Sequence, residues 1–595
     1  MALEFLPESG ASPAAYLEAA RAVQSAAHDE ALVPLRVSVV ASFTADVLAP
    51  YLTVEGARRG LGIDVEFGPY GQLEQQLLDA GSPTLARRPD VVVVATRAED
   101  LAPALLDELL TMDADDVAAE VAAVERRITA LLEGARARTD AALLVFNHAP
   151  PRYAPAGVAD GGQSVSIASA IAAVNDAIAR ACAAVPGCFV FDLARVAAEV
   201  GLARWSDARL AHLGRIPFSA AAQQEIGRAL ARRLRSLRMP PRKCLVLDLD
   251  NTLWGGVLGE DGPGGIKLGA DYPGNVFSSF QRHVKRLRSR GVLLAVASKN
   301  NPADALEVLD GHPDCVLRSS DFAALQISWE DKATSLLAIA RELNIGVDSL
   351  AFFDDNPVER EWVRSRLPQV AVVDVPASPT GYVEALEAAE LFDHPVLTEE
   401  DGRRADLYRA ERQRREAQVG SGSVEEFLRS LEMQVTMGEI DDATLPRVAQ
   451  LLQKTNQFNL TTRRHTASEV AAMLDSGGIG VWMRVADRFG DNGLVGVALA
   501  TPRGDGVWDV DSFLLSCRVI GRRVEACLLA ELARLVAARG GHTLVGHFVP
   551  SEKNAVAARM YPDLGFAPAG DGSWNWKLFQ GLPLQPDFVY ICSQP

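Results

Sequence analysis

Two aspartates one residue apart, Asp248 and Asp250, directly follow the apolar run 245–247. A short apolar run of this kind is typical of a buried parallel strand. The carboxyl ends of parallel strands are where open α/β sheets bind their ligands. Because carboxylate oxygens are preferred ligands of hard cations, the pattern predicts a cation site at the end of this strand.

A second predicted strand, at 291–297, leads directly into Ser298, Lys299 and Asn300. Their hydroxyl, ammonium and amide groups can donate hydrogen bonds to phosphate oxygens. Since parallel strands end at one edge of a sheet, we expect these donors to lie beside the two aspartates. The three residues are therefore predicted to bind a substrate phosphate.

Charged residues also occur at the start of a predicted helix and at the end of a third predicted strand. Lys332 opens a predicted helix, where its ammonium can neutralise a phosphorylated carboxylate. Asp354 and Asp355 end a third predicted strand, at 349–353. A lone Asp-Asp or a lone Lys is usually a solvated surface group, but the order of all these groups, most of them right after apolar strands, favours a single site.

This order resembles the phosphoryl-transfer motifs of the haloacid dehalogenase (HAD) superfamily: Asp248, Asp250 and Thr252, then Ser298, then Lys332, and last Asp354 and Asp355. The resemblance implies that Asp248 attacks the phosphorus atom and that Asp250 is the general acid and base. Mg²⁺ would bind Asp248, the backbone carbonyl of Asp250, and the pair Asp354 and Asp355. Thr252, Ser298 and Lys332 would contact the phosphate.

No cap domain is expected over this site. The Gly-rich stretch 255–265 and the interval between Ser298 and Lys332 are both too short to fold as a helical cap. Neighbouring domains or a protein substrate would have to cover the crevice. An uncapped site favours a substrate that another protein presents.

Composition argues against several classes of partner. The 595 residues carry a formal net charge of −18, whereas nucleic acids and anionic membranes select basic patches. No apolar run approaches the roughly 20 residues of a membrane span, and the first residues lack the basic segment of a secretory leader. The 7 cysteines are scattered without Cys-x-x-Cys spacing, which indicates neither a zinc site nor a disulfide framework. We expect a cytoplasmic protein.

The chain divides into three predicted α/β parts and a linker. Residues 1–238 alternate apolar strands with Ala- and Leu-rich helices, which is typical of a parallel sheet. Residues 239–398 carry the phosphoryl site. Residues 399–423 are predicted to form a charged helix and a Gly-Ser link, and residues 424–595 mix strands and helices.

Several stretches closely resemble the FkbH-like proteins of polyketide assembly (HAD subfamily IIIC): 243–256, 297–301, 353–361, 454–463, 487–492 and 513–522. The resemblance is looser over the first part. Members of that family take the glyceryl group of 1,3-bisphosphoglycerate, lose phosphate, and load the glyceryl as a thioester on the phosphopantetheine arm of an acyl carrier protein. The resemblance implies the same donor and partner for this chain.

The last part can be interpreted independently. A predicted strand at 509–516 leads into a predicted helix at 524–532, and backbone amides at a helix start bind phosphate. This pattern resembles the GNAT acyltransferases, although Arg523 replaces the Gly or Ala usual in their loop, which suits the single phosphate of a carrier's phosphopantetheine. The resemblance implies that four residues contact the pantetheine arm: Arg518, Gly521, Asn554 and Tyr561.

Cys517 ends that strand, beside Arg518 and just before a helix start. A neighbouring guanidinium and a helix N-terminus both lower a thiol pKa, so a thiolate here could accept the glyceryl group and pass it to the pantetheine thiol. The alternative is a small buried core residue, the common fate of a free cysteine. Cys244, Cys315 and Cys527 lie in apolar patterns and are predicted to be core residues.

The first part loosely resembles the SGNH esterase or flavodoxin-like sheet. Ser42, Asn147 followed by His148, and Asp207 with His212 are its candidate hydrolytic groups. The Gly-Asp-Ser motif is absent, and Asp207 and His212 are too far apart in sequence for that family's Asp-x-x-His pair. A non-catalytic domain for docking or covering is therefore favoured.

We therefore expect an enzyme that dephosphorylates 1,3-bisphosphoglycerate at the middle part and delivers the glyceryl group to a carrier protein at the last. The C1 acyl phosphate would be attacked by Cys517 or directly by the carrier thiol. The main alternative is a plain Mg²⁺-dependent HAD phosphatase acting on a small phosphate ester. A binding-only scaffold is a third, weaker interpretation because the phosphoryl motifs are intact.

Overall fold

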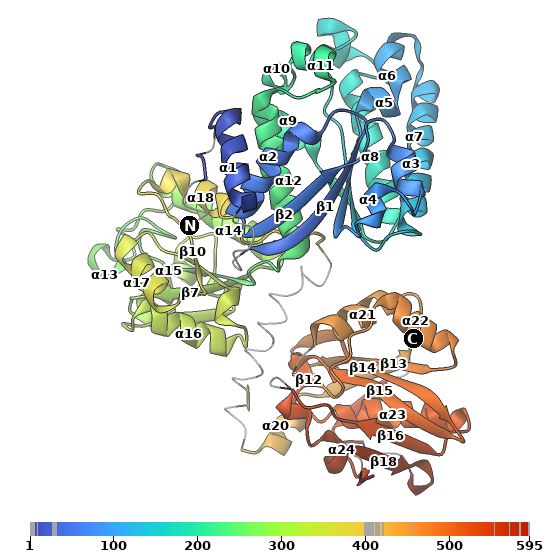
Figure 1. The fold of residues 1–595 in the computed structure, drawn as a ribbon. Coiled ribbons are helices and arrows are strands. Elements are labelled where there is room, and N and C mark those ends of the chain that lie inside the picture. Colours follow the sequence, from blue (N-terminus) through green and yellow to red (C-terminus); the bar gives the residue numbers. More distant parts are fainter. Residues whose placement is uncertain are drawn as a thin grey trace. The chain divides into compact units, whose positions relative to one another are not determined.

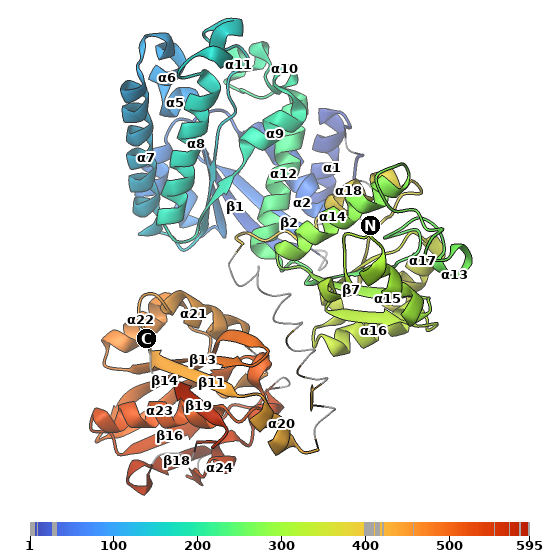
Figure 2. The same cartoon turned by 180° about the vertical axis from the view of Figure 1, so that it is seen from behind.

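The computed structural model describes residues 6–8, 10–25, 32–397, 410, 414, 417–418, 422–455, 457–551, 554–570, 572–581 and 585–592, without the side chains of Lys454, Ser468, Cys517 and Gln580. Within these residues the strands form three sheets (Figures 1 and 2). The chain folds into two compact units, one of residues 1–242 and 387–397 and the other of residues 243–386 and 398–595. Two parallel sheets and one mixed sheet confirm the predicted α/β fold class.

The first sheet is parallel, with the strand order β2-β1-β3-β4-β5, which is the flavodoxin-like order. Its strands are β1 (Val33–Ala41), β2 (Leu61–Phe67), β3 (Val91–Ala95), β4 (Ala142–Phe146) and β5 (Cys188–Phe191). The larger helices are α1 (Pro13–Ser25), α2 (Ala49–Arg58), α7 (Ala114–Arg136), α8 (Ile167–Ala184), α9 (Leu193–Val200) and α12 (Ala220–Arg238). Short helices connect them: α3 (Leu73–Leu78), α4 (Pro83–Ala86), α5 (Ala98–Leu101), α6 (Pro103–Asp107), α10 (Leu202–Trp205) and α11 (Ala208–Gly214).

Side chains of the central strand β3 alternate between two apolar cores. Val91 and Val93 belong to the core beneath α2, α9 and α12, whereas Val92 and Val94 belong to the core beneath α7 and α8. Helices cover both faces of the sheet, and this explains why its strands are apolar throughout.

Helix α8 has the length and composition of a membrane span, the one such helix among the described residues. It buries Ile171, Val174 and Ile178 in the core that it shares with α7 and the sheet. A helix that packs on both a sheet and a second helix is apolar for that reason.

Residues 387–397, assigned by sequence to the middle part, pack in the first unit instead. Nε and Nη2 of Arg59 donate to the two carboxylate oxygens of Glu390, each at 2.7 Å. Arg232 donates to Asp393 at 2.6 and 2.8 Å. These paired bonds join residues far apart in sequence, so no local pattern marks this boundary. The predicted linker, 399–423, lies mostly outside the described residues.

The middle sheet is parallel, with the order β10-β9-β6-β7-β8. Its strands are β6 (Cys244–Leu247), β7 (Leu293–Ser298), β8 (Ala324–Ile327), β9 (Leu350–Phe353) and β10 (Ala371–Val372). Its helices are α13 (Leu258–Asp261), α14 (Gly274–Ser289), α15 (Pro302–Gly311), α16 (Lys332–Glu342), α17 (Pro357–Arg366) and α18 (Tyr382–Ala388). Between β6 and α14, where all residues are described, the only α-helix is the 4-residue α13. This agrees with the prediction that the stretch 255–265 is too short to form a helical cap.

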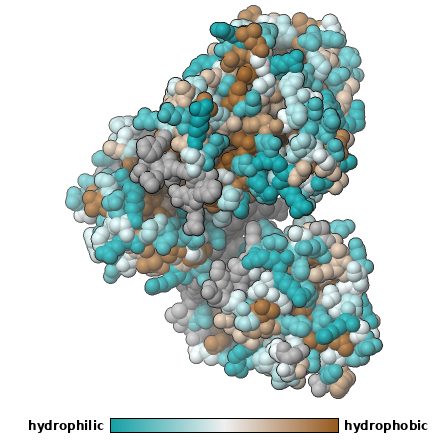
Figure 3. All heavy atoms as spheres, in the orientation of Figure 1, coloured by the Kyte–Doolittle hydropathy of each residue, from teal (hydrophilic) through white to brown (hydrophobic). Residues whose placement is uncertain are grey.

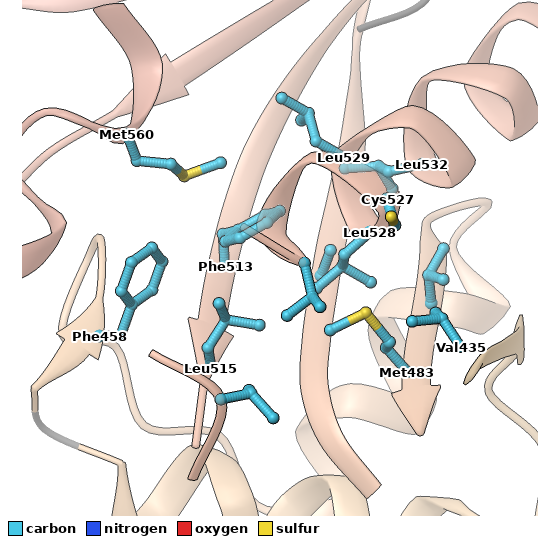
Figure 4. Close-up of a cluster of buried hydrophobic side chains, with 14 of the residues drawn as sticks. Val435, Phe458, Met483, Phe513, Leu515, Cys527, Leu528, Leu529, Leu532 and Met560 are labelled. Atoms are coloured by element: carbon cyan, nitrogen blue, oxygen red, sulfur yellow. The ribbon is translucent and has the colours of Figure 1, made fainter. Parts of the chain in front are cut away.

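The third sheet is mixed, with the order β17-β18-β16-β15-β14-β13-β11-β19 and β12 paired to β15. Its strands are β11 (Met433–Glu439), β12 (Phe458–Asn459), β13 (Ile479–Asp487), β14 (Gly490–Gly504), β15 (Val507–Leu515), β16 (Thr543–His547), β17 (Ala567–Pro568), β18 (Ser573–Lys577) and β19 (Val589–Cys592). Its helices are α20 (Val424–Ser430), α21 (Leu445–Lys454), α22 (Ala467–Asp475), α23 (Glu525–Ala538) and α24 (Met560–Asp563). α23 packs on one face, where Leu528 and Cys527 belong to the same buried cluster as Phe513 and Met483 (Figure 4).

Hydrophobic residues (brown) are interrupted by hydrophilic ones (teal) on the face drawn in Figure 3. Such a mixture is ordinary for a folded chain, because apolar atoms contribute more than half of most protein surfaces. The informative polar groups are therefore the buried ones.

A buried ion-pair network holds one residue of the predicted linker against the third sheet. Asp487, at the end of β13, has a side chain with 0% exposure. It accepts bonds from Arg414 at 2.7 and 2.8 Å and from Arg522 at 2.9 Å. A buried carboxylate is tolerated when charged donors surround it.

Replacing this carboxylate is expected to destabilise the last part. Asp487→Ala deprives two buried guanidinium groups of their shared counter-ion. We therefore expect the free energy of local unfolding around β13 and α23 to fall by about 3 to 5 kcal/mol. Hydrogen exchange of β13 and α23 peptides, read by mass spectrometry, localises the effect. The control Asp491→Ala removes a half-exposed partner of Arg484 and should change that free energy by less than about 1 kcal/mol. Equal effects of both variants would contradict the assignment.

Candidate active site

Three carboxylates meet at the carboxyl edge of the middle sheet. β6 and β9 are neighbours, with Leu247 opposite Phe353, so Asp248 and Asp354 follow adjacent strand ends. One oxygen each of Asp248, Asp354 and Asp355 lies within 4.8 Å of the others. Oxygen donors this close together suit a hard divalent cation such as Mg²⁺.

Lys332 lies among these carboxylates. Its Nζ is 2.6 Å from Asp248 and 3.0 Å from Asp354, and it donates to the carbonyl of Ala297 at 2.7 Å. The residue is 2% exposed. Burial by itself disfavours the ammonium, but Asp248 and Asp354 raise the pKa of Lys332 above its ordinary value, so it carries its charge.

One ammonium does not balance three carboxylates. Burial, together with the neighbouring Asp248, raises the pKa of Asp354 to about 7. The same two causes raise the pKa of Asp355. An added cation would relieve this repulsion, so the donor set fits a divalent metal ion.

Asp250 is held apart from this cluster. One of its carboxylate oxygens accepts bonds from Trp254 Nε1 at 2.9 Å and from the backbone N–H of Leu258 at 3.1 Å. The other accepts from Asn300 Nδ2 at 3.0 Å. These donors fix the orientation of a carboxylate that is outside the metal-ligand cluster, as a group that transfers protons requires.

Local sequence explains how the strand ends are shaped. Asn301 and Asn356 each cap a helix that begins with proline, and they accept bonds from the backbone two residues on. Asp331 caps α16 through the N–H of Thr334 at 3.1 Å, which fixes the start of the helix that carries Lys332. Each turn therefore presents its polar side chains at the sheet edge.

The predicted phosphate-binding residues divide into two groups. Thr252 Oγ1 lies 3.3 Å from Asp355, and Asn300 donates to Ser298 Oγ at 3.2 Å, so these three side chains border the site. Lys299, in contrast, pairs with Glu359 at 2.6 Å. Its ammonium is therefore engaged with α17 in this structure.

Two supporting residues were not identified from sequence. Tyr382 is 3% exposed and donates to the carbonyl of Asn251 at 2.9 Å; Asn251 has a left-handed backbone with φ 51°. Arg360 donates to the carbonyls of Asp354 and Asp355, both at 2.7 Å. Arg360 lay within the 353–361 motif, but Tyr382 had no local signal.

Of the residues predicted to contact the pantetheine arm, some line a pocket or its surroundings and others are buried. Arg518 donates to the carbonyl of Asn492 at 3.0 Å, and Gly521, with φ 80°, lines a pocket of about 150 Å³. Arg414 and Arg522 also line that pocket. Both arginines bond the buried Asp487, so guanidinium groups border the pocket.

Asn554 and Tyr561, predicted to contact a pantetheine arm, are 0% and 1% exposed. The amide of Asn554 donates to the carbonyls of Asn459 and Val549 at 2.9 Å and accepts from the N–H of Ser551 at 2.8 Å. These contacts give Asn554 a loop-positioning role. Burial raises the pKa of Tyr561, whose ring packs closely over Gly546.

The cysteines also divide. Cys244, Cys315 and Cys527 are buried, and burial raises the pKa of each thiol, as expected for core residues. The backbone of Cys517 begins a 3₁₀ turn at the end of β15. Its side chain lies outside the described residues, so its catalytic assignment stays a prediction.

The candidate hydrolytic groups of the first part have other partners or are exposed. Asp207 caps α11 through two backbone N–H groups, and His212 is exposed on that helix. Asn147 bonds Asp192 and the N–H of Ala194.

The other two candidates are also engaged or enclosed. Ser42 Oγ accepts from the N–H of Arg97 at 3.1 Å. His148 is 3% exposed, and burial lowers its pKa to about 4. These contacts support the non-catalytic interpretation of the first part.

No family model and no curated protein matches the chain. Among solved structures, it is similar to the N-terminal part of protein BF1531 from Bacteroides fragilis, which contains a phosphatase domain and is complexed with Mg. The identity is 29%, the match covers 64% of this chain and 99% of that chain, and the TM-score is 0.55. This likeness agrees with the α/β architecture of the parallel sheets.

Shorter segments are similar to GNAT-family proteins. One is a putative acetyltransferase from Desulfovibrio desulfuricans, at 19% identity over 24% of this chain and 99% of that chain, with a TM-score of 0.20. Another is yncA from Salmonella typhimurium, a putative acetyltransferase with its cofactor acetyl-CoA, at 16% identity over 26% of this chain and 98% of that chain, with a TM-score of 0.19.

The carboxylate cluster predicts a measurable stabilisation by Mg²⁺. At 100 times its dissociation constant, a ligand of the folded state adds about 2.7 kcal/mol of stability, so the wild type should unfold at a higher temperature with Mg²⁺. Asp354→Asn, which removes a buried ligand, should lose that shift in scanning fluorimetry. Asp374→Asn, at a side chain that is 94% exposed, should keep it. A full shift in Asp354→Asn would argue against the site.

Proposed function

We propose that this protein is an Mg²⁺-dependent enzyme that dephosphorylates 1,3-bisphosphoglycerate and loads the glyceryl group onto the phosphopantetheine arm of an acyl carrier protein. The observation that carries the proposal is the convergence of Asp248, Asp250, Lys332 and Asp354 at one sheet edge. The FkbH-like motifs supply the substrate and partner. The similarity to a phosphatase-containing structure complexed with Mg supports the phosphoryl chemistry.

Asp248, Asp354 and Asp355 would hold the Mg²⁺. When bound, the ion supplies the positive charge that offsets repulsion between the carboxylates and an incoming phosphate. Lys332, which contacts both Asp248 and Asp354, adds a second positive charge to the site. The close approach of the Asp248, Asp354 and Asp355 oxygens supports binding of such a cation.

The phosphoryl step uses Asp248 and Asp250 in turn. An oxygen of Asp248 attacks the phosphorus atom of the 3-phosphate, and the substrate oxygen leaves with a proton from Asp250. Water then attacks the aspartyl phosphate while Asp250 takes back a proton, which releases inorganic phosphate and restores Asp248. Trp254 and Asn300 keep Asp250 oriented through both steps.

The lack of a cap supports a partner that covers the site. Trp329 and Val358 are 77% and 73% exposed, and both lie in sequence within four residues of a site residue. A site without a cap leaves room for another surface to cover it. A carrier protein or the bound substrate would supply that surface.

The acyl step requires a thiolate at the C1 carbonyl. The thiolate forms a carbon–sulfur bond, the carbon–oxygen bond to the C1 phosphate breaks, and phosphate leaves. The pocket beside Gly521, which Arg414 and Arg522 line, supports binding of the arm's phosphate. Either Cys517 or the carrier thiol supplies the sulfur.

Incubation with carrier protein, Mg²⁺ and 1,3-bisphosphoglycerate tests the proposal. We expect the carrier to gain one glyceryl mass while phosphate is released. Asp248→Asn should abolish removal of the 3-phosphate because it removes the nucleophile; Asp374→Asn is the matched control and should retain it. Intact-protein mass spectrometry and a phosphate assay read both events.

Phosphate release without any glyceryl on the carrier would reject glyceryl transfer and favour a plain phosphatase. Removal of the 3-phosphate by Asp248→Asn at the wild-type rate would reject the phosphoryl assignment itself.

Cys517→Ala separates the two routes of acyl transfer. A route through this thiol predicts a glyceryl mass on the wild-type enzyme and no carrier loading by the variant. Direct attack by the carrier thiol predicts no enzyme-bound glyceryl and continued loading. Cys592→Ala, at a partly exposed cysteine on β19, controls for general effects of losing a thiol.

A further inference from the structure

A histidine and an aspartate form a second chemical pair in the last part of the chain. His465 Nε2 lies 2.7 Å from Asp511 Oδ1. The Asp511 side chain is 7% exposed and that of His465 is 14% exposed. The phosphoryl site uses neither residue.

The partners of Asp511 define which ring nitrogen of His465 carries a hydrogen. Although burial raises it, bonds from Ser512 and His465 and the charge of Arg463 leave the pKa of Asp511 below its ordinary value. An ionised carboxylate only accepts hydrogen bonds, so His465 Nε2 must carry a hydrogen. Nδ1 of a neutral His465 is then the basic nitrogen.

Arg463 also contacts the Asp511 carboxylate, and His465 keeps one ring nitrogen free of a hydrogen bond to the described residues. Arg463 pairs with the second oxygen of Asp511, so the carboxylate already has a cationic partner. Within the described chain, no hydrogen bond occupies His465 Nδ1, and that nitrogen is not among the buried atoms without a partner. It is therefore an accessible proton acceptor.

The pair sits where the third sheet changes its pairing. β15 pairs with β16 only from Val507 to Asp509. On β14, Leu499 pairs with Ser512 and Ala500 with Val510, which leaves Asp511 as the extra residue of a bulge. Bulges re-aim a side chain and are common beside active sites.

A short strand brings the histidine to this bulge. β12 pairs with the end of β15 (Figure 1), and Thr461 Oγ1 then donates to the carbonyl of Asp511 at 2.8 Å. The chain continues from there to Arg463 and His465. The β12 segment thus holds both partners of Asp511 in place.

The distance along β15 between Asp511 and the loop that carries Gly521 fits a long flexible arm. β15 continues from Asp511 to Leu515 and enters the loop that carries Gly521. At ~3.3 Å per residue, the start of that loop lies roughly 15 to 20 Å from Asp511. An extended phosphopantetheine arm anchored at the start of that loop is long enough to span this distance.

We propose that His465, held by Asp511, takes the proton from the pantetheine thiol during acyl transfer. The proton moves from sulfur to Nδ1, the thiolate attacks the glyceryl carbonyl, and the bond from that carbon to the phosphate oxygen breaks. This inference rests on the proposed function and implies direct attack by the carrier thiol, because Cys517 lies at the far end of that span.

Loading of the carrier by His465→Gln tests the proposal. Removal of a general base costs about 10² to 10⁴ in rate, so we expect carrier loading to fall at least 100-fold while removal of the 3-phosphate continues. Asp511→Asn should lower loading as well. An aryl thiol ionises more readily than an alkyl thiol, so glyceryl transfer to thiophenol should survive in His465→Gln.

The matched control is His547→Gln. His547 also bonds an aspartate of β15, Asp509, at 3.0 Å, but Asp509 lies where β15 and β16 are still paired. The His547→Gln variant should therefore load the carrier at the wild-type rate.

Four results would overturn the inference. They are wild-type loading by His465→Gln, equal loss with the carrier and with thiophenol, equal loss in His547→Gln, or loss of loading in Cys517→Ala. A wild type that releases phosphate but never loads the carrier would overturn the proposed function together with this inference.

Discussion

The ammonium of Lys332 is the group on which the phosphoryl site depends. It bonds a carbonyl at the end of β7 and carboxylates that follow β6 and β9, so one side chain joins three strand ends. Buried carboxylates would otherwise repel one another and separate or become protonated. Its charge keeps Asp248 and Asp354 close enough to share a cation.

The same principle organises the last part of the chain. Asp487 and Asp511 are both little exposed, and each is surrounded by cationic or hydrogen-bonding partners from distant segments. Buried charges of this kind add little net stability, but they fix where loops must lie. Asp487 fixes the pocket beside Gly521, and Asp511 fixes the loop after β12.

Much of the fold and of the phosphoryl site followed from local patterns. Apolar runs located β6, β7 and β9 to within two residues, and polar residues right after them had to meet at one edge. Local patterns did not predict the positions of segments that are held by ion pairs with residues distant in sequence. The segment 387–397 joined the first unit through Arg59 and Arg232, and Lys299 paired with a glutamate on α17.

The sequence by itself determined the chemistry available to this protein: a set of carboxylates, a lysine and phosphate-binding donors at strand ends, because strand ends are set by neighbouring residues. Tertiary structure alone decided which groups act together. Trp254 and Asn300 converge on Asp250, and β12 carries His465 to Asp511. Such contacts depend on how strands pair and where a bulge falls, and sequence spacing contains no measure of either.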